Sequence, residues 1–74
     1  MTRALSTLLL QRGSQERRVL VALRAGPAMI SVVCYASGVR HTASVLRRLE
    51  RAGYVENTRR DVWALTPAGL EVVS

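Results

Sequence analysis

Arginines recur at helical spacing in the middle of this chain. Arg40, Arg47 and Arg51 are seven and four residues apart, so a helix over residues 40–52 places them on one side. The other side of that helix is apolar and is formed by Thr42, Val45, Leu46, Leu49 and Ala52. Guanidinium groups on the open face of a helix can pair with phosphates or donate to guanine edges. The spacing therefore predicts a surface that binds a polyanion.

This surface offers candidates for both base and phosphate contacts on DNA. Arginine donates two hydrogen bonds to guanine, and serine or histidine can bond several bases. The candidates for base edges are Arg40, His41, Ser44 and Arg47. Further along the helix, Arg48 and Arg51 are expected to hold phosphates. Arg59 and Arg60, at the expected tip of a hairpin, can reach a backbone or the adjacent minor groove.

The charge of the chain favours the same interpretation. All eleven basic residues are arginine, five residues are acidic, and the formal net charge is +6. Residues 40–60 hold six arginines and two glutamates, a net charge of +4, so the charge is concentrated where the helix is expected. This distribution is typical of nucleic-acid binding. The simpler alternatives are a solvated arginine face, arginine enrichment from genome composition, and a capping role for His41.

Catalysis and metal binding find no support in the sequence. The acids are scattered, and none is positioned to orient His41 as a base for Ser44. One cysteine and one histidine cannot assemble a zinc site, and Cys34 is expected to be a small buried residue. We therefore expect a non-enzyme without cofactor, metal or small-molecule substrate.

Cysteine usage and hydropathy indicate the compartment. The single cysteine fits a reducing environment. The apolar run over residues 4–10 is followed by no small-residue cleavage site, and no stretch approaches the ~20 apolar residues that cross a membrane. The sequence predicts a soluble, cytoplasmic protein.

Capping and turn residues divide the chain into elements. Ser14 can cap one helix, Gly26-Pro27 ends it, and Thr66-Pro67 begins the last helix, in which Leu70 and Val73 are expected to face inward. Residues 32–37 suit either a strand or a helix, and we expect a helix because the next helix needs a partner. The expected helices are 1–13, 15–25, 32–37, 40–52 and 68–73, and the expected strands are 28–30, 54–56 and 62–65, with a turn at 57–61.

Three segments in this order resemble the winged helix-turn-helix regulators, in particular the bacterial MarR-like and PadR-like group. They are Val33–Val39, similar to the second helix and turn; Leu46–Val55, similar to the end of the recognition helix; and Trp63–Gly69, similar to the return strand and the Leu-Thr-Pro-x-Gly start of the last helix. The likeness covers roughly residues 15–73. The chain departs from the family pattern by being about two residues shorter between Gly38 and Gly53 and by having a short wing.

The resemblance implies a mainly α fold with a small β-wing. The winged helix-turn-helix domain would span residues 14–74, preceded by a helical extension over 1–13. Its leucines, Leu8, Leu9 and Leu10, would either cover the domain's own core or pair with a second copy. Because such motifs commonly bind two half-sites, we expect a homodimer.

The resemblance also implies a function. The chain would be a sequence-specific regulator of transcription, of bacterial or phage type, that binds double-stranded DNA. The helix 40–52 would enter the major groove, and the wing 55–65 would contact the backbone or minor groove. The sequence leaves open repression or activation. It also leaves open two other functions: a protein–protein adaptor in transcription or replication, and a non-specific nucleic-acid binder.

Overall fold

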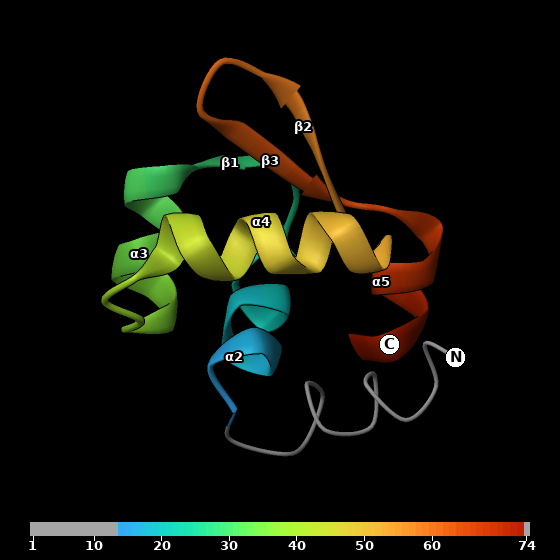
Figure 1. The fold of residues 1–74 in the computed structure, drawn as a ribbon, viewed down its shortest axis with the longest axis horizontal. Coiled ribbons are helices and arrows are strands. Elements are labelled where there is room, and N and C mark those ends of the chain that lie inside the picture. Colours follow the sequence, from blue (N-terminus) through green and yellow to red (C-terminus); the bar gives the residue numbers. More distant parts are fainter. Residues whose placement is uncertain (1–13, 74) are drawn as a thin grey trace.

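Residues 14–73 form four helices and a three-stranded antiparallel sheet in the computed structural model, which describes this range (Figure 1). In chain order the elements are α2 (Gln15–Ala22), β1 (Ala28–Met29), α3 (Ile30–Ser37), α4 (Thr42–Ala52), β2 (Val55–Arg59), β3 (Val62–Leu65) and α5 (Pro67–Val73). The order expected from the sequence is confirmed for this range. The expected extension over residues 1–13, with its Leu8–Leu10 run, lies outside the described residues.

The first described helix begins where its capping residue predicts. The backbone N–H of Arg17 donates to Ser14 Oγ at 3.1 Å, which satisfies one of the open donors of the first turn. The helix ends at Ala22, three residues earlier than expected. The chain then continues in tighter turns, because the N–H of Arg24 bonds to the carbonyl of Val21 and the N–H of Gly26 to that of Leu23, each only three residues back.

β3 is the central strand of the sheet, which has the order β1-β3-β2. The expected strand near residue 28 is confirmed, and it pairs with β3 through Ala28 opposite Trp63. On the other side of β3, Asn57 of β2 is also opposite Trp63. The sequence does not predict which strand pairs with β1, because the pairing joins segments more than thirty residues apart.

The β2–β3 hairpin is longer than the sequence predicts. Residues 57–59, expected in a turn, belong to β2, and the loop comprises only Arg60 and Asp61. The side-chain amide of Asn57 donates to the carbonyls of Arg59 at 2.7 Å and Val62 at 2.8 Å, which holds both strands near the loop. Asp61 adopts a left-handed conformation with φ 61°, which aspartate tolerates in turns.

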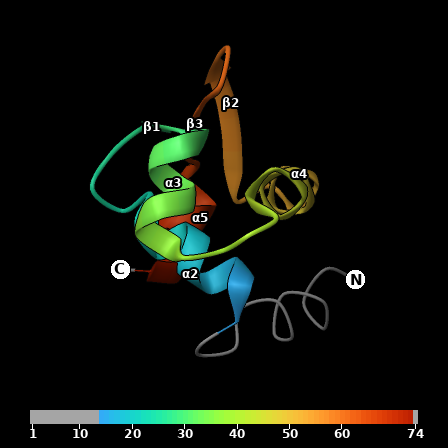
Figure 2. The same ribbon diagram turned by 90° about the vertical axis from the view of Figure 1, so that its left-hand side faces the viewer.

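One apolar core joins the helices to the sheet. The predicted apolar face of α4 is confirmed as buried, and Val19 and Leu20 of α2 and Trp63 of β3 lie in the same core. The core residues are Val19, Leu20, Leu23, Val33, Val39, Val45, Leu46, Leu49, Val55, Trp63 and Val73. Figure 2 shows α4 nearly along its axis at one side of the domain, so only one face of this helix meets the core.

The last helix packs through glycine rather than leucine. Thr66 caps α5 by accepting from the N–H of Gly69 at 3.2 Å, and its hydroxyl donates to the carbonyl of Gly53 at 2.6 Å. The prediction that Leu70 faces inward is wrong, because this side chain is 50% exposed. Gly69 and Val73 are the buried residues of α5, since the missing side chain of Gly69 lets the helix approach the carbonyl of Tyr54.

We predict that Gly69→Ala destabilises the protein. Helix propensity alone favours alanine over glycine by about 1 kcal/mol. A Cβ at this position, however, would overlap the Tyr54 carbonyl oxygen, and overpacking a rigid contact costs about 1–3 kcal/mol. Urea unfolding measures the free energy of unfolding of both proteins. A more stable Gly69→Ala variant would contradict the close approach of α5.

Candidate nucleic-acid interface

The burial of one side of α4 leaves the other side open to solvent. The buried residues are Thr42, Val45, Leu46 and Leu49. The exposed residues of α4 are Ala43, Ser44, Arg47, Arg48, Glu50 and Arg51. Four of them share one side of the helix, which we call the α4 face: Ala43, Ser44, Arg47 and Arg51. Because residues three and four apart share a side of a helix, these four form one stripe. The structure therefore brings together three of the residues predicted to bind: one serine and two arginines.

Two predicted site residues lie before the helix rather than in it. The prediction that the helix starts at Arg40 is wrong, since α4 begins at Thr42 and His41 is its N-cap residue. His41 makes no capping hydrogen bond with its side chain. The helix starts late because the Thr42 hydroxyl donates to the carbonyl of Val39 at 2.8 Å, while Val39 itself is buried in the core. Arg40 and His41 stay exposed at the amino end of the α4 face.

The corner between α3 and α4 is held by several short hydrogen bonds. Gly38 has φ 70°, a left-handed conformation that favours glycine. Ser37 Oγ accepts from the N–H of Val39 at 3.2 Å, and the half-buried Cys34 thiol donates to the carbonyl of Val39 at 3.3 Å. These two bonds tie the N–H and the carbonyl of the buried Val39 to side chains of α3. The direction in which α4 leaves the corner is thereby fixed.

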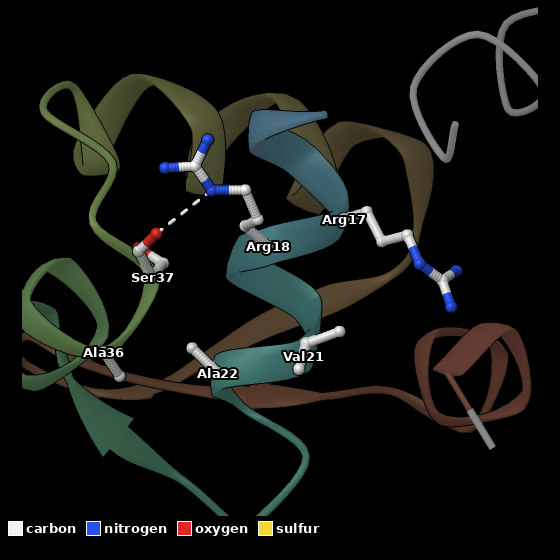
Figure 3. Close-up of a pocket in the computed structure, with 6 residues that line it drawn as sticks. All are labelled: Arg17, Arg18, Val21, Ala22, Ala36 and Ser37. Atoms are coloured by element: carbon white, nitrogen blue, oxygen red, sulfur yellow. Dashed lines mark hydrogen bonds between the residues drawn. The ribbon is translucent and has the colours of Figure 1, made fainter. Parts of the chain in front are cut away.

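Arg18 also holds this corner, a role that the sequence analysis does not predict. Its Nε donates to the carbonyl of Ser37 at 3.2 Å, and its Nη2 donates to the carbonyl of Gly38 at 3.4 Å. Figure 3 shows the side chain extending from α2 toward the end of α3. The two carbonyls that end α3 thus face a positive charge, which stabilises a helix carboxyl end. Nineteen residues separate Arg18 from Ser37, so no local pattern predicts the contact.

Arg48 differs from the other predicted arginines because it pairs with an acid. Its Nη1 donates to Glu16 Oε2 at 2.6 Å, and the side chains of Arg48 and Glu16 are 56% and 10% exposed. The sequence analysis predicts that Arg48 contacts a phosphate of DNA. The structure places it instead in an ion pair that joins α4 to the first turn of α2. This pair positions α4 rather than adding an open charge to its face.

The remaining predicted arginines are exposed. Within residues 14–73 their guanidinium groups form no salt bridge or hydrogen bond; they are Arg40, Arg47, Arg51, Arg59 and Arg60. Arg51 also lies in the last turn of α4, where a cation stabilises the helix dipole. Arg59 and Arg60 belong to the end of the β2–β3 hairpin, which projects beyond α4 (Figures 1 and 2). These exposed arginines therefore lie on the α4 face, at its amino end and on the hairpin.

The described range offers little to other kinds of site. No group of three histidine, cysteine, aspartate or glutamate side chains in residues 14–73 could hold a metal ion. None of the helices in that range has the length and apolar character that crossing a membrane requires. No protein-family model, curated protein or solved structure matches the chain. The exposed arginine surface is therefore the feature of the described range that bears on function.

We predict that Glu16→Gln destabilises the protein by about 0.5–1 kcal/mol. The substitution removes the charge that faces Arg48, and the effect stays small because the guanidinium is more than half exposed to water. Glu50→Gln is the matched control, since Glu50 is exposed on the same helix as Arg48. The free energy of unfolding is measured in urea for both variants. Equal stability of the two variants would mean that the ion pair contributes nothing.

Proposed function

We propose that this chain is a sequence-specific DNA-binding protein that regulates transcription, with α4 as its recognition helix. We further propose that the fold is a winged helix-turn-helix. In this assignment α3, the corner and α4 are the helix-turn-helix, and the β2–β3 hairpin is the wing. The observation that carries the proposal is the α4 face, where Arg47 and Arg51 are exposed and unpaired within the described range.

The dimensions of α4 fit a major groove. A helix with its side chains is about 10–12 Å across, and the major groove of B-DNA is about 12 Å wide. Eleven residues give α4 a length of about 16 Å, enough to follow the groove over several base pairs. The exposed position of α4 at one side of the domain leaves room for a duplex along it (Figure 2). The helix would enter with its amino end, where Arg40 and His41 lie.

Each open side chain has a distinct role in this proposal. Arg47 and Ser44, in the middle of the α4 face, contact base edges, and Arg47 donates two hydrogen bonds to a guanine. Arg51, one turn further on, pairs with a phosphate and fixes the register. Arg40 and His41 contact the bases or backbone where the helix enters the groove. Arg48 has a positioning role, because its guanidinium is engaged by Glu16.

The hairpin supplies a second set of contacts. Arg59 and Arg60 stand at its end and carry no salt bridge within residues 14–73. A cationic loop beside the recognition helix can bind the backbone or the narrow minor groove, where the negative potential is strongest. The Asn57 amide bonds hold the two strands near this loop, which keeps both arginines in place. We propose no catalytic step for any of these residues.

The assignment of base and phosphate contacts is tested by two single substitutions. We predict that Arg47→Ala costs about 1–3 kcal/mol on the preferred duplex and much less on a random one. Arg51→Ala is expected to weaken binding to both duplexes equally. Arg24→Ala is the charge-matched control, since Arg24 is exposed in the turn after α2. The chain between α2 and β1 lies on the opposite side of the domain from α4 (Figure 2). An equal loss on both duplexes for Arg47→Ala would show that Arg47 reads no base.

The proposed function itself is tested by titration against selected and random duplexes at increasing salt. A specific regulator loses overall affinity as salt displaces its phosphate contacts, with a slope of about −0.9 per contact, yet it keeps its preference. A non-specific binder loses affinity for both duplexes in parallel and shows no preference. An adaptor that docks an acidic protein would bind neither duplex. Either of the last two results would contradict the proposal.

A further inference from the structure

A hollow of about 220 Å³ lies between α2 and α3 (Figure 3). Its lining residues are Arg17, Arg18, Val21, Ala22, Ala36 and Ser37. The floor is apolar and open, because Ala22 and Ala36 have only methyl side chains and Val21 is 47% exposed. A depression of this size can admit one large apolar side chain.

The apolar surface continues from the hollow along α3. Met29, Val32 and Tyr35 follow one another at three-residue spacing, and they are 51%, 53% and 91% exposed. Val32 is four residues from Ala36, so the hollow and this row of side chains share one side of the helix. α3 contains no charged residue. Large apolar side chains gathered on a surface in this way are typical of a protein contact.

Two guanidinium groups flank the hollow, and acidic residues do not neutralise them. Arg17 and Arg18 extend in opposite directions from α2 (Figure 3), and Arg17 forms no salt bridge with another residue of the range 14–73. Arg18 donates through Nε and Nη2 to the corner carbonyls, which uses two of its five N–H donors. Glu16, the acidic residue of α2, is paired with Arg48. Both arginines therefore keep donors for a ligand.

We propose that this surface binds an acidic segment of another protein. An apolar residue of the segment occupies the hollow and contacts Val21, Ala22 and Ala36. Because Arg17 and Arg18 extend in opposite directions, each pairs with a carboxylate of its own, and the segment carries an acidic residue on either side of the apolar one. The free Nη1 and Nη2 donors of Arg18 can bind a carboxylate with two hydrogen bonds.

Charge and extent select this occupant. The net charge of +6 attracts acidic chains and repels basic ones, a second copy of this chain included. A small anion could fill the hollow, but it would leave uncovered the row from Met29 to Tyr35, which is about 9 Å long. A polypeptide segment covers the hollow and the row together. Tyr35 suits such a partner, because its ring offers apolar area and its hydroxyl can donate to a carboxylate.

This surface is separate from the α4 face. None of the residues that line the hollow belongs to α4. The inference therefore does not rest on the proposed DNA binding. If both hold, the chain carries a second protein to its DNA site.

A library of random peptides displayed on phage and selected on the immobilised full-length protein provides the probe. We expect the selected peptides to have a net negative charge and a large apolar residue with an acidic residue on either side. The dissociation constant of one selected peptide is then measured by calorimetry at low and high salt. Wild type and variants are compared, and circular dichroism confirms that each variant is folded.

Two variants test the two parts of the surface. Ala36→Phe fills the hollow and should raise the dissociation constant at least about 30-fold, as for the loss of a central contact. Arg17→Glu should raise it about tenfold at low salt and less at high salt, because an exposed charge pair is screened. Ala68→Phe, on the exposed side of α5, and Arg24→Glu, in the turn after α2, are the matched controls. Each control should change the constant less than about threefold.

Several results would overturn the proposal. Selection could enrich no peptide or peptides without acidic residues, or the controls could weaken binding as much as Ala36→Phe and Arg17→Glu. Loss of binding on Arg47→Glu but not on Ala36→Phe would assign the peptide to the α4 face. A wild-type dimer in sedimentation equilibrium that Ala36→Phe dissociates would assign the hollow to a second copy.

Binding to DNA separates this inference from the proposed function. Ala36→Phe should bind duplex DNA with the affinity of the wild type. If neither protein binds DNA while Ala36→Phe still loses the peptide, the DNA-binding proposal fails and the docking surface stands.

Discussion

The structure depends on the single apolar stripe of α4. Leu46 and Leu49 are fully buried, and burying one such side chain contributes about 1.5–3 kcal/mol. Rotating the helix to hide Arg47 would expose both leucines and bury an unpaired cation, which costs several kcal/mol more. The hydrophobic effect therefore sets the rotation of α4. The arginines face solvent as a consequence, whatever they bind there.

Rotation alone does not fix where the helix points, and contacts from α2 supply that constraint. Arg18 holds the carbonyls that end α3, and Glu16 pairs with Arg48 near the middle of α4. Both residues lie in the first turns of α2, so one short helix braces the corner and the helix that follows it. The N–H and carbonyl of the buried Val39 complete the brace. A surface that reads a rigid duplex needs such positioning, because small displacements misplace every hydrogen bond.

Local chemistry explains what could be predicted from the sequence. The cap at Ser14, the cap at Thr66 and the stripe of α4 depend on neighbours within four residues, and each is found in the structure. The missed features join distant segments: the Arg48 ion pair spans 32 residues, and the packing of Gly69 on Tyr54 turned Leu70 outward. Helical spacing shows which residues share one face of a helix. It does not show which residues from distant segments contact that face. The sequence therefore indicates the exposed face of α4, but it does not show that Arg48 is paired with Glu16.

The most direct test of the account follows the amide and arginine Nε–H signals of the protein by NMR while a selected duplex is added. If α4 reads the major groove, the largest shifts fall on the α4 face, from Ala43 to Arg51, with smaller shifts at Arg59 and Arg60. The buried side of α4 and the Arg48 side chain should change little. Shifts confined to other surfaces, or no shifts at a saturating concentration of duplex, would contradict the central claim.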